Sequence, residues 1–183
     1  MTKSLSLCLA GVIAGLFVCT DTVQAEDRRH EEGRRLTLAV DFDYAAAISN
    51  DLEIDRGGGG AFRIGSELDL LLVTLIPELN LAYHSFGGER DDRDATTFTG
   101  TLGGRIRFLK ILEPGIFAHA GVGHIGGYDP HTGFAFDAGL TLDFTLLPLI
   151  DLGVHAAWNR VFGGDEHPGL SYATVGAHVA LVL

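Results

Sequence analysis

The stretch Gly133–Leu146, GFAFDAGLTLDFTL, alternates without a break between two kinds of residue. Successive side chains of an extended strand point to opposite faces. One face would carry bulky or apolar side chains: Phe134, Phe136, Ala138, Leu140, Leu142, Phe144 and Leu146. The other would carry small, hydroxyl or acidic ones: Ala135, Asp137, Gly139, Thr141, Asp143 and Thr145. An ordinary strand has about five or six residues, whereas a transmembrane β-strand needs about nine to eleven. The stretch therefore predicts a membrane-spanning strand.

The first 25 residues have the plan of a cleaved signal peptide. Lys3 supplies a positive start, Leu7–Cys19 is apolar, and the small residues Val23 and Ala25 precede a predicted cut after Ala25. The apolar run is too short to cross a membrane as a helix. Both cysteines of the chain lie inside this segment, so the exported protein has no thiol. Disulfide, thiolate-metal and cysteine-nucleophile sites are thereby excluded.

The charge balance argues against a nucleic-acid partner. The formal net charge is −11, and it stays the same after cleavage because Lys3 and Asp21 are removed together. Lys110 is then the one remaining lysine. A soluble domain normally covers about a quarter to a third of its surface with mixed charged residues. After the signal peptide, the chain also lacks the roughly eighteen-residue apolar run of a membrane helix.

The same alternation recurs along the rest of the chain. We expect a charged lead-in at residues 26–35 and a barrel domain at 36–183. The alternating segments are 36–46, 61–70, 78–86, 96–108, 116–125, 133–146, 151–162 and 172–183. Polar, glycine-rich connections at 48–60, 87–94, 126–132 and 163–169 alternate with short turns marked by Pro77, Pro114 and Pro148. This organisation predicts an all-β fold, an eight-stranded antiparallel up-and-down transmembrane β-barrel.

Alternation alone does not say which face points outward, because a soluble lipocalin-like barrel would place its apolar face inside. The apolar face is too bulky for the interior of eight strands, which the small residues of the other face suit. The aromatic residues support the membrane interpretation, since two rims of rings are typical of membrane interfaces. The rim at the loop end would contain Tyr44, Tyr83, Phe98, Phe134 and Trp158, and the rim at the turn end Phe108 and Phe144.

On these grounds the chain resembles the eight-stranded outer-membrane β-barrel family, of which the OmpA transmembrane domain and OmpX are the known types. The resemblance rests on the signal peptide, the eight alternating segments and the closing residues 172–183, YATVGAHVALVL, which look like the family's C-terminal assembly signal. That signal usually ends in Phe, and Leu183 stands here instead. The resemblance implies a location in the outer membrane of a Gram-negative bacterium. It also implies outer-membrane lipid, lipopolysaccharide and the outer-membrane assembly machinery as partners.

The face predicted to line the lumen carries charges of both signs: Arg63, Glu67, Asp69, Glu78, Arg105, Arg107 and Asp143. They would form either an ionic gate in a narrow conduit or a charge network that plugs the lumen. We favour the plug, because eight strands leave little open bore and unpaired buried charges are costly.

Four histidines, His84, His119, His155 and His178, share the inward register. They would form either a cluster that binds a metal or titrates near neutral pH, or separate polar side chains hydrogen-bonded to their neighbours. The second interpretation is favoured, and no metal or other cofactor is expected.

The predicted function is structural or surface-interactive, in an integral outer-membrane barrel whose polar lumen is plugged. A narrow pore or small-solute conduit is the alternative, and a lipid-modifying enzyme is a weaker one. His84 and Ser85 are adjacent and so face opposite ways, which does not suit a Ser–His catalytic pair. We therefore do not expect an enzyme.

Overall fold

The computed structural model describes residues 35–48, 54–70, 73–88, 94–108, 112–127, 130–147, 149–164 and 167–183. Contacts divide the chain into Met1–Gly33 and Arg34–Leu183, and every described residue belongs to the second unit. The predicted signal peptide, 1–25, lies outside the described residues, as does the predicted lead-in up to residue 34.

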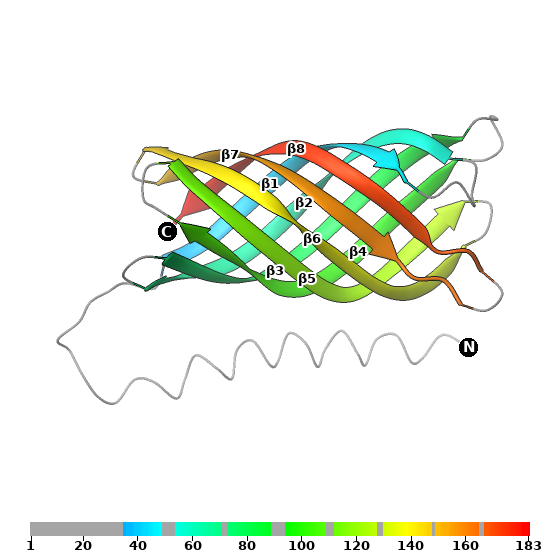
Figure 1. The fold of residues 1–183 in the computed structure, drawn as a ribbon, viewed down its shortest axis with the longest axis horizontal. Coiled ribbons are helices and arrows are strands. Elements are labelled where there is room, and N and C mark those ends of the chain that lie inside the picture. The colour runs from blue at the N-terminus through cyan, green and yellow to red at the C-terminus, as the bar shows by residue number, and fades with distance from the viewer. Residues whose placement is uncertain are drawn as a thin grey trace, which may run out of the picture. The chain divides into compact units, whose positions relative to one another are not determined.

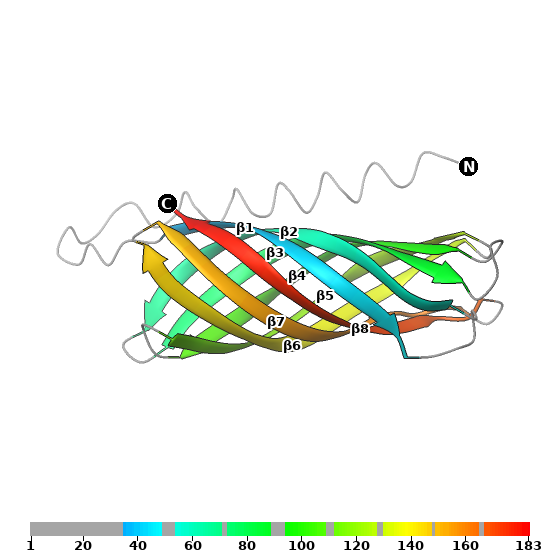
Figure 2. The same ribbon diagram turned by 90° about the horizontal axis from the view of Figure 1, so that it is seen from above.

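The described residues form a closed barrel of eight antiparallel strands in chain order, as predicted (Figures 1 and 2). The strands are β1 (Arg35–Ala47), β2 (Ile54–Leu70), β3 (Val73–Gly88), β4 (Ala95–Phe108), β5 (Leu112–Gly127), β6 (His131–Leu147), β7 (Ile150–Val161) and β8 (Leu170–Val182). The stretch 133–146 thus lies within β6. No helix among these residues is long and apolar enough to cross a membrane.

The two ends of the barrel differ in the length of their connections. Residues 48–53, 89–94, 128–130 and 162–169 connect strands at one end, called the loop end below. Strands β2, β4, β6 and β8 finish at the opposite turn end (Figure 1), and only residues 71–72, 109–111 and 148–149 separate the first three of them from the next strand in sequence.

The barrel closes where β1 pairs with β8. At the turn end of this seam, the Leu36 N–H donates to the Leu183 carbonyl at 2.9 Å, and the Leu183 N–H donates to the Leu36 carbonyl at 2.8 Å. Closure leaves no unpaired strand edge, which an open sheet would expose to aggregation.

Several strands extend further than the sequence predicts. Gly57–Gly60, predicted as part of a connection, lie in β2 and pair with Phe42–Ala45 of β1. A Cβ at Gly57 or Gly59 would collide with the β3 backbone, so glycine permits this close approach.

Two of the three prolines predicted to mark turns lie inside strands instead. Pro77 is in β3 opposite Gly104, and Pro114 is in β5 opposite Leu142. Both are near the turn-side start of their strand, where the loss of one N–H donor disturbs little of the ladder. Pro148 lies outside the described residues.

The outward face is apolar around the whole barrel. Each strand exposes at least one large hydrophobic side chain: Phe42, Phe62, Leu81, Phe98, Ile116, Leu140, Trp158 and Val175. Leu140 is 63% exposed and Val175 60%, whereas inward charged residues such as Arg105 are about 4% exposed. This distribution is the reverse of that in a water-soluble domain, and it is what contact with lipid requires.

Candidate functional site: the polar lumen

The lumen accommodates five ring side chains because a glycine stands opposite each of these five on a neighbouring strand. These pairs are His84 with Gly59, His119 with Gly103, His155 with Gly176, His178 with Gly153 and Phe117 with Gly139. A Cβ on any of these glycines would lie 2.5–2.8 Å from a ring atom of its partner, closer than real Cβ contacts. Each ring therefore fills the space that a side chain on the next strand would need.

Arg107 on β4 is surrounded by carboxylates in the turn-side half of the lumen. Its guanidinium group donates to Glu67 and, at 2.9 Å, to Asp151. Glu113 lies 3.2 Å and Asp143 3.7 Å from it. These groups are at least 90% buried, so their mutual pairing replaces solvation by water.

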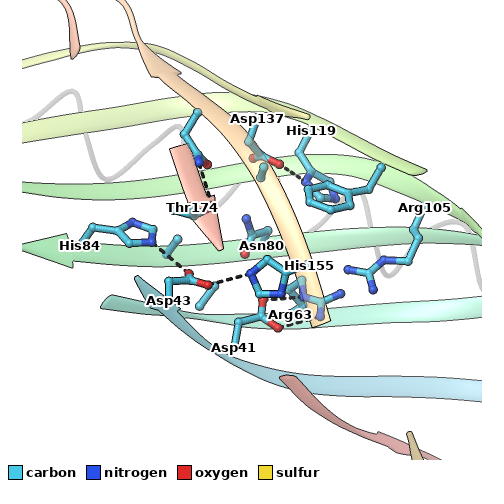
Figure 3. Close-up of a pocket in the computed structure, with 15 residues that line it drawn as sticks. Asp41, Asp43, Arg63, Asn80, His84, Arg105, His119, Asp137, His155 and Thr174 are labelled. Atoms are coloured by element: carbon cyan, nitrogen blue, oxygen red, sulfur yellow. Dashed lines mark hydrogen bonds and ion pairs between the residues drawn. The ribbon is translucent and has the colours of Figure 1, made fainter. Parts of the chain in front are cut away.

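Two further arginines meet at Glu78 nearer the middle of the barrel. Arg63 donates to both carboxylate oxygens of Asp41 at 2.7 Å, and a further nitrogen lies 3.3 Å from Glu78 (Figure 3). Arg105 lies 3.4 Å from Glu78 and 3.6 Å from Asp143. The bidentate pair fixes the plane of the Arg63 guanidinium group.

Every lumen histidine has a carboxylate partner. His119 lies between Asp137, at 2.5 Å from Nδ1, and Glu78, at 2.9 Å from Nε2. The Nε2 atoms of His84 and His155 both contact Asp43, at 3.0 and 2.7 Å (Figure 3). His178 Nε2 lies 2.7 Å from Asp143.

The four histidines do not form a single cluster. His155 and His178 are neighbours, with ring centroids 5.7 Å apart. His84 is linked to His155 only through Asp43, and His119 has its own acids. The structure therefore places one close pair of histidines and two more separated ones in the lumen.

Asp69 was predicted in the charge network, and that prediction is wrong. It is exposed, lies 3.6 Å from Arg35 and accepts a hydrogen bond from Thr74. Asp69 is the penultimate residue of β2, so its inward register carries it past the turn-side mouth of the lumen. The other six predicted members, Arg63, Glu67, Glu78, Arg105, Arg107 and Asp143, are buried and in contact as described above.

The predicted network also omits five lumen acids: Asp41, Asp43, Glu113, Asp137 and Asp151. The inward register of four of them, Asp41, Asp43, Asp137 and Asp151, would have identified them. Glu113 fell in a predicted turn, so its register was not considered.

An apolar layer lies at the loop end of the lumen. It consists of Ala45, Ile54, Phe86, Ala95, Ile125, Ala135, Val161, Leu170 and Tyr172, all buried. The Phe86 and Tyr172 rings meet edge to face, with centroids 5.1 Å apart. The Tyr172 hydroxyl lies 3.4 Å from both Thr97 and His84 and so joins this layer to the polar region below it. Continuing the alternation of each strand to its loop end would have predicted these positions except Ile54, which a register shift between Ile54 and Gly57 turns inward.

The cavities between these side chains are small. One of about 40 Å³ is lined by residues including Asp41, Arg63, His119 and His155 (Figure 3). A second of about 10 Å³ is lined by residues including Arg107 and His178. One water needs about 10–15 Å³, and a drug-sized ligand about 300–1,000 Å³. Each of these two cavities thus has room for only a few waters or a single ion.

Carboxylates outnumber basic groups among the described lumen residues. Eight acids face inward: Asp41, Asp43, Glu67, Glu78, Glu113, Asp137, Asp143 and Asp151. Three arginines and four histidines accompany them, so an excess of negative charge remains even when every histidine is protonated. Such an interior attracts cations.

Comparison with known proteins identifies the fold but no closer relative. No family model matches the chain, and no curated protein matches it. Among solved structures, Neisserial surface protein A has 16% identity and a TM-score of 0.60, covering 82% of this chain and 99% of that one. Ail, the attachment invasion locus protein of Yersinia pestis, has 12% identity and a TM-score of 0.53, covering 82% and 97%. The chain has the fold of the eight-stranded outer-membrane β-barrels.

One of the structural neighbours of this chain is an enzyme. The outer membrane enzyme PagL has 16% identity and a TM-score of 0.52, covering 78% of this chain and 97% of that one. Likeness at this level shows the fold alone. In the present chain His84 is 2% exposed in the lumen, whereas the adjacent Ser85 lies on the outer face. These two residues therefore do not form a catalytic pair.

The predicted rim residues all lie on the outward face of the barrel. Toward the loop end, Tyr44, Tyr83, Phe98, Phe134 and Trp158 are 41–55% exposed, and toward the turn end Phe108 and Phe144 are each 39% exposed. Beyond the loop-end rim the outward residues of β3–β6 become polar, whereas Ile48 after β1 and Phe162 after β7 are exposed and apolar. The cross-strand pair Ser85 and Thr96 follows the pair Tyr83 and Phe98, and the pair His124 and Thr132 follows Val122 and Phe134. We call these four polar residues the collar.

Proposed function

We propose that this protein is an integral outer-membrane barrel with a plugged lumen and a structural or surface-interaction role. The observation that carries the proposal is the ion-pair network, to which β1–β7 contribute charged side chains and β8 contributes His178. The apolar layer lies above it at the loop end. A water-filled conduit would need an open bore through both regions, and eight strands provide little room for one.

The collar supports a role at the cell surface. Strands β3 and β5 each contain 16 residues. At about 3.3 Å per residue and a tilt of about 45°, such a strand rises roughly 37 Å, whereas the apolar band of an outer-membrane barrel is about 25 Å tall. Strands of this length would extend beyond the bilayer, and the polar collar supports an extension at the loop end. Outer-membrane barrels carry their longer loops on the extracellular side. Two structural neighbours are named as a surface protein and an attachment invasion locus protein.

Lipopolysaccharide is the proposed lipid partner. Arg160 lies near the loop-end rim, donates a hydrogen bond to Ser171 at 2.8 Å and stacks 4.8 Å from the centroid of the Phe162 ring. These contacts hold a guanidinium group at the height of the outer-leaflet head groups, where it can pair with phosphate. The outer-membrane assembly machinery is the proposed partner during insertion.

Single-channel recording in planar bilayers tests the plug. We expect the refolded protein to give no stable conductance steps, and Arg105→Ala to lower stability and produce openings. Arg35→Ala is the control, because Arg35 lies outside the lumen in an exposed pair with Asp69. Regular conductance steps from the wild-type protein would establish the narrow pore instead. If Arg105→Ala changed neither stability nor conductance, the network would have no plugging role.

The same protein can be tested for lipid modification, because an outer-membrane enzyme shares its fold. Mass spectra of lipid A from cells with and without the protein should be identical under the proposed function. A mass change that depends on the protein would replace the structural role with an enzymatic one.

A further inference from the structure

We propose that Asp41, His155 and His178 form a binding site for a divalent transition-metal ion of the zinc class. One ligand atom from each of these residues lies within 4.8 Å of the ligand atoms of the other two. The residues come from β1, β7 and β8, on both sides of the barrel seam. Glycine at positions 153 and 176 lets the two imidazole rings lie across the neighbouring strands toward each other.

The free ring nitrogens identify the ligand atoms. The Nε2 atoms of His155 and His178 lie 2.7 Å from Asp43 and Asp143 respectively. Both Nδ1 atoms are buried and have no hydrogen-bond partner. A metal-bound histidine almost always donates its second ring N–H to a carboxylate or carbonyl, which fixes the tautomer and raises the basicity of the ligating nitrogen. With Nε2–H donated to an acid, each Nδ1 presents a lone pair to an ion.

Asp41 can serve as the third ligand while keeping its arginine. Its two oxygens accept one hydrogen bond each from Arg63 at 2.7 Å. A carboxylate has about four lone-pair sites, so each oxygen retains one for a cation. Because the lumen holds more acidic than basic groups, its excess negative charge favours binding of that cation.

The ligand set selects the class of ion. Two imidazole nitrogens with one carboxylate oxygen suit zinc and neighbouring transition metals, whereas calcium and magnesium prefer oxygen ligands alone. Zinc bonds of about 2.0–2.1 Å place tetrahedral ligand atoms roughly 3.3–3.5 Å apart. Small side-chain rotations, moving atoms by about an ångström, would close the present arrangement around an ion. Asp41 and His155 also line the 40 Å³ cavity, which has room for a water as the fourth ligand.

Zinc titration of the refolded full-length mature protein by calorimetry tests the site. We expect one tightly bound Zn²⁺ per barrel, with affinity reduced at least 100-fold in His155→Gln and in His178→Gln. His119→Gln is the matched control, because His119 is an equally buried histidine with both ring nitrogens engaged by acids. It should bind zinc within about threefold of wild type. A double variant, His131→Gln with His167→Gln, removes a stacked pair of histidines near the loop end and should also retain binding.

A measurement on the wild-type protein guards against variants that fail to fold. In ¹⁵N spectra of labelled histidine, zinc should shift the Nδ1 signals of two residues and leave their Nε2–H signals in place. The proposal is overturned if the wild type binds no zinc or if His155→Gln keeps full affinity. It is equally overturned if binding disappears in the His131/His167 double variant, or if the ring nitrogen that shifts is Nε2.

Discussion

Replacing Arg107 with methionine should destabilise the barrel far more than replacing an exposed arginine. Arg107 is about 5% exposed and lies against four carboxylates. Asp143 keeps Arg105 and His178 after the change, whereas Glu67, Glu113 and Asp151 lose the arginine they contact in the lumen. Removing one partner of a buried ion pair costs about 3–5 kcal/mol, because the remaining charge is left without compensation. With three acids affected, we expect the upper part of that range.

The assay is guanidinium unfolding of the protein in lipid vesicles, followed by fluorescence. Trp158 is the single tryptophan of the chain and lies on the outward face, so its emission reports loss of lipid contact. A loss of 3–5 kcal/mol corresponds to a roughly 10²–10⁴-fold change in the unfolding equilibrium constant. The slope of the unfolding free energy against denaturant concentration should be the same for the wild type and the variant if both unfold from the same barrel.

Arg35→Met is the matched control, since Arg35 pairs with Asp69 at 3.6 Å and both side chains are about half exposed. An exposed pair of this kind contributes about 0–1 kcal/mol. Equal losses for Arg107→Met and Arg35→Met would refute the argument that the lumen charges stabilise one another. A more stable Arg107→Met would refute it as well.

Three further changes test other features of the barrel. Gly176→Ala should lower the free energy of unfolding by about 1–3 kcal/mol through overpacking, because the new Cβ would lie 2.8 Å from His155. Gly100→Ala is the control: its Cβ would meet only Leu81, at 3.5 Å, so the change should be nearly neutral in the same unfolding assay. Leu140→Arg should lower the free energy of unfolding in vesicles by about 2–4 kcal/mol if this outward residue lies near the bilayer midplane, whereas Thr132→Arg in the collar should lower it by about 0–1 kcal/mol. Equal losses for the two variants would contradict the assignment of Leu140 to the lipid-facing surface. Phe86→Ala should cost about 3–5 kcal/mol by opening a cavity in the apolar layer, and an unchanged unfolding midpoint would show that the layer adds no stability.

Side-chain alternation was sufficient to predict the fold, because a strand's two faces meet different surroundings and a one-residue slip would exchange them. That is why β6 could be recognised from 133–146 and the strand count from its recurrence. The strand ends were harder to predict. Gly57–Gly60 and Pro77 favour turns by local propensity, but pairing with neighbouring strands keeps them extended.

Alternation says which residues face the lumen but not which of them meet. Asp41 and Arg63 lie on neighbouring strands, whereas His178 reaches Asp143 past the whole of β7. Such contacts depend on the stagger between strands, a property of the closed barrel, which sets His178 opposite Gly153, where no side chain blocks the way to Asp143. Asp69 was assigned to the lumen for the same reason, since side-chain register does not tell at which residue a strand leaves the lumen.

The β1–β8 seam differs from the other seven strand contacts in the distance along the chain that it spans. Every other pair is a hairpin of consecutive strands, whereas Leu36 bonds to Leu183. Because these residues already meet in space, a short linker between them, with a cut at the 71–72 turn, would give a circularly permuted protein with the same hydrogen bonds. Such a rearranged protein should refold into lipid vesicles with the same strand pairs, and we therefore expect that the order of the hairpins along the chain does not determine the native state.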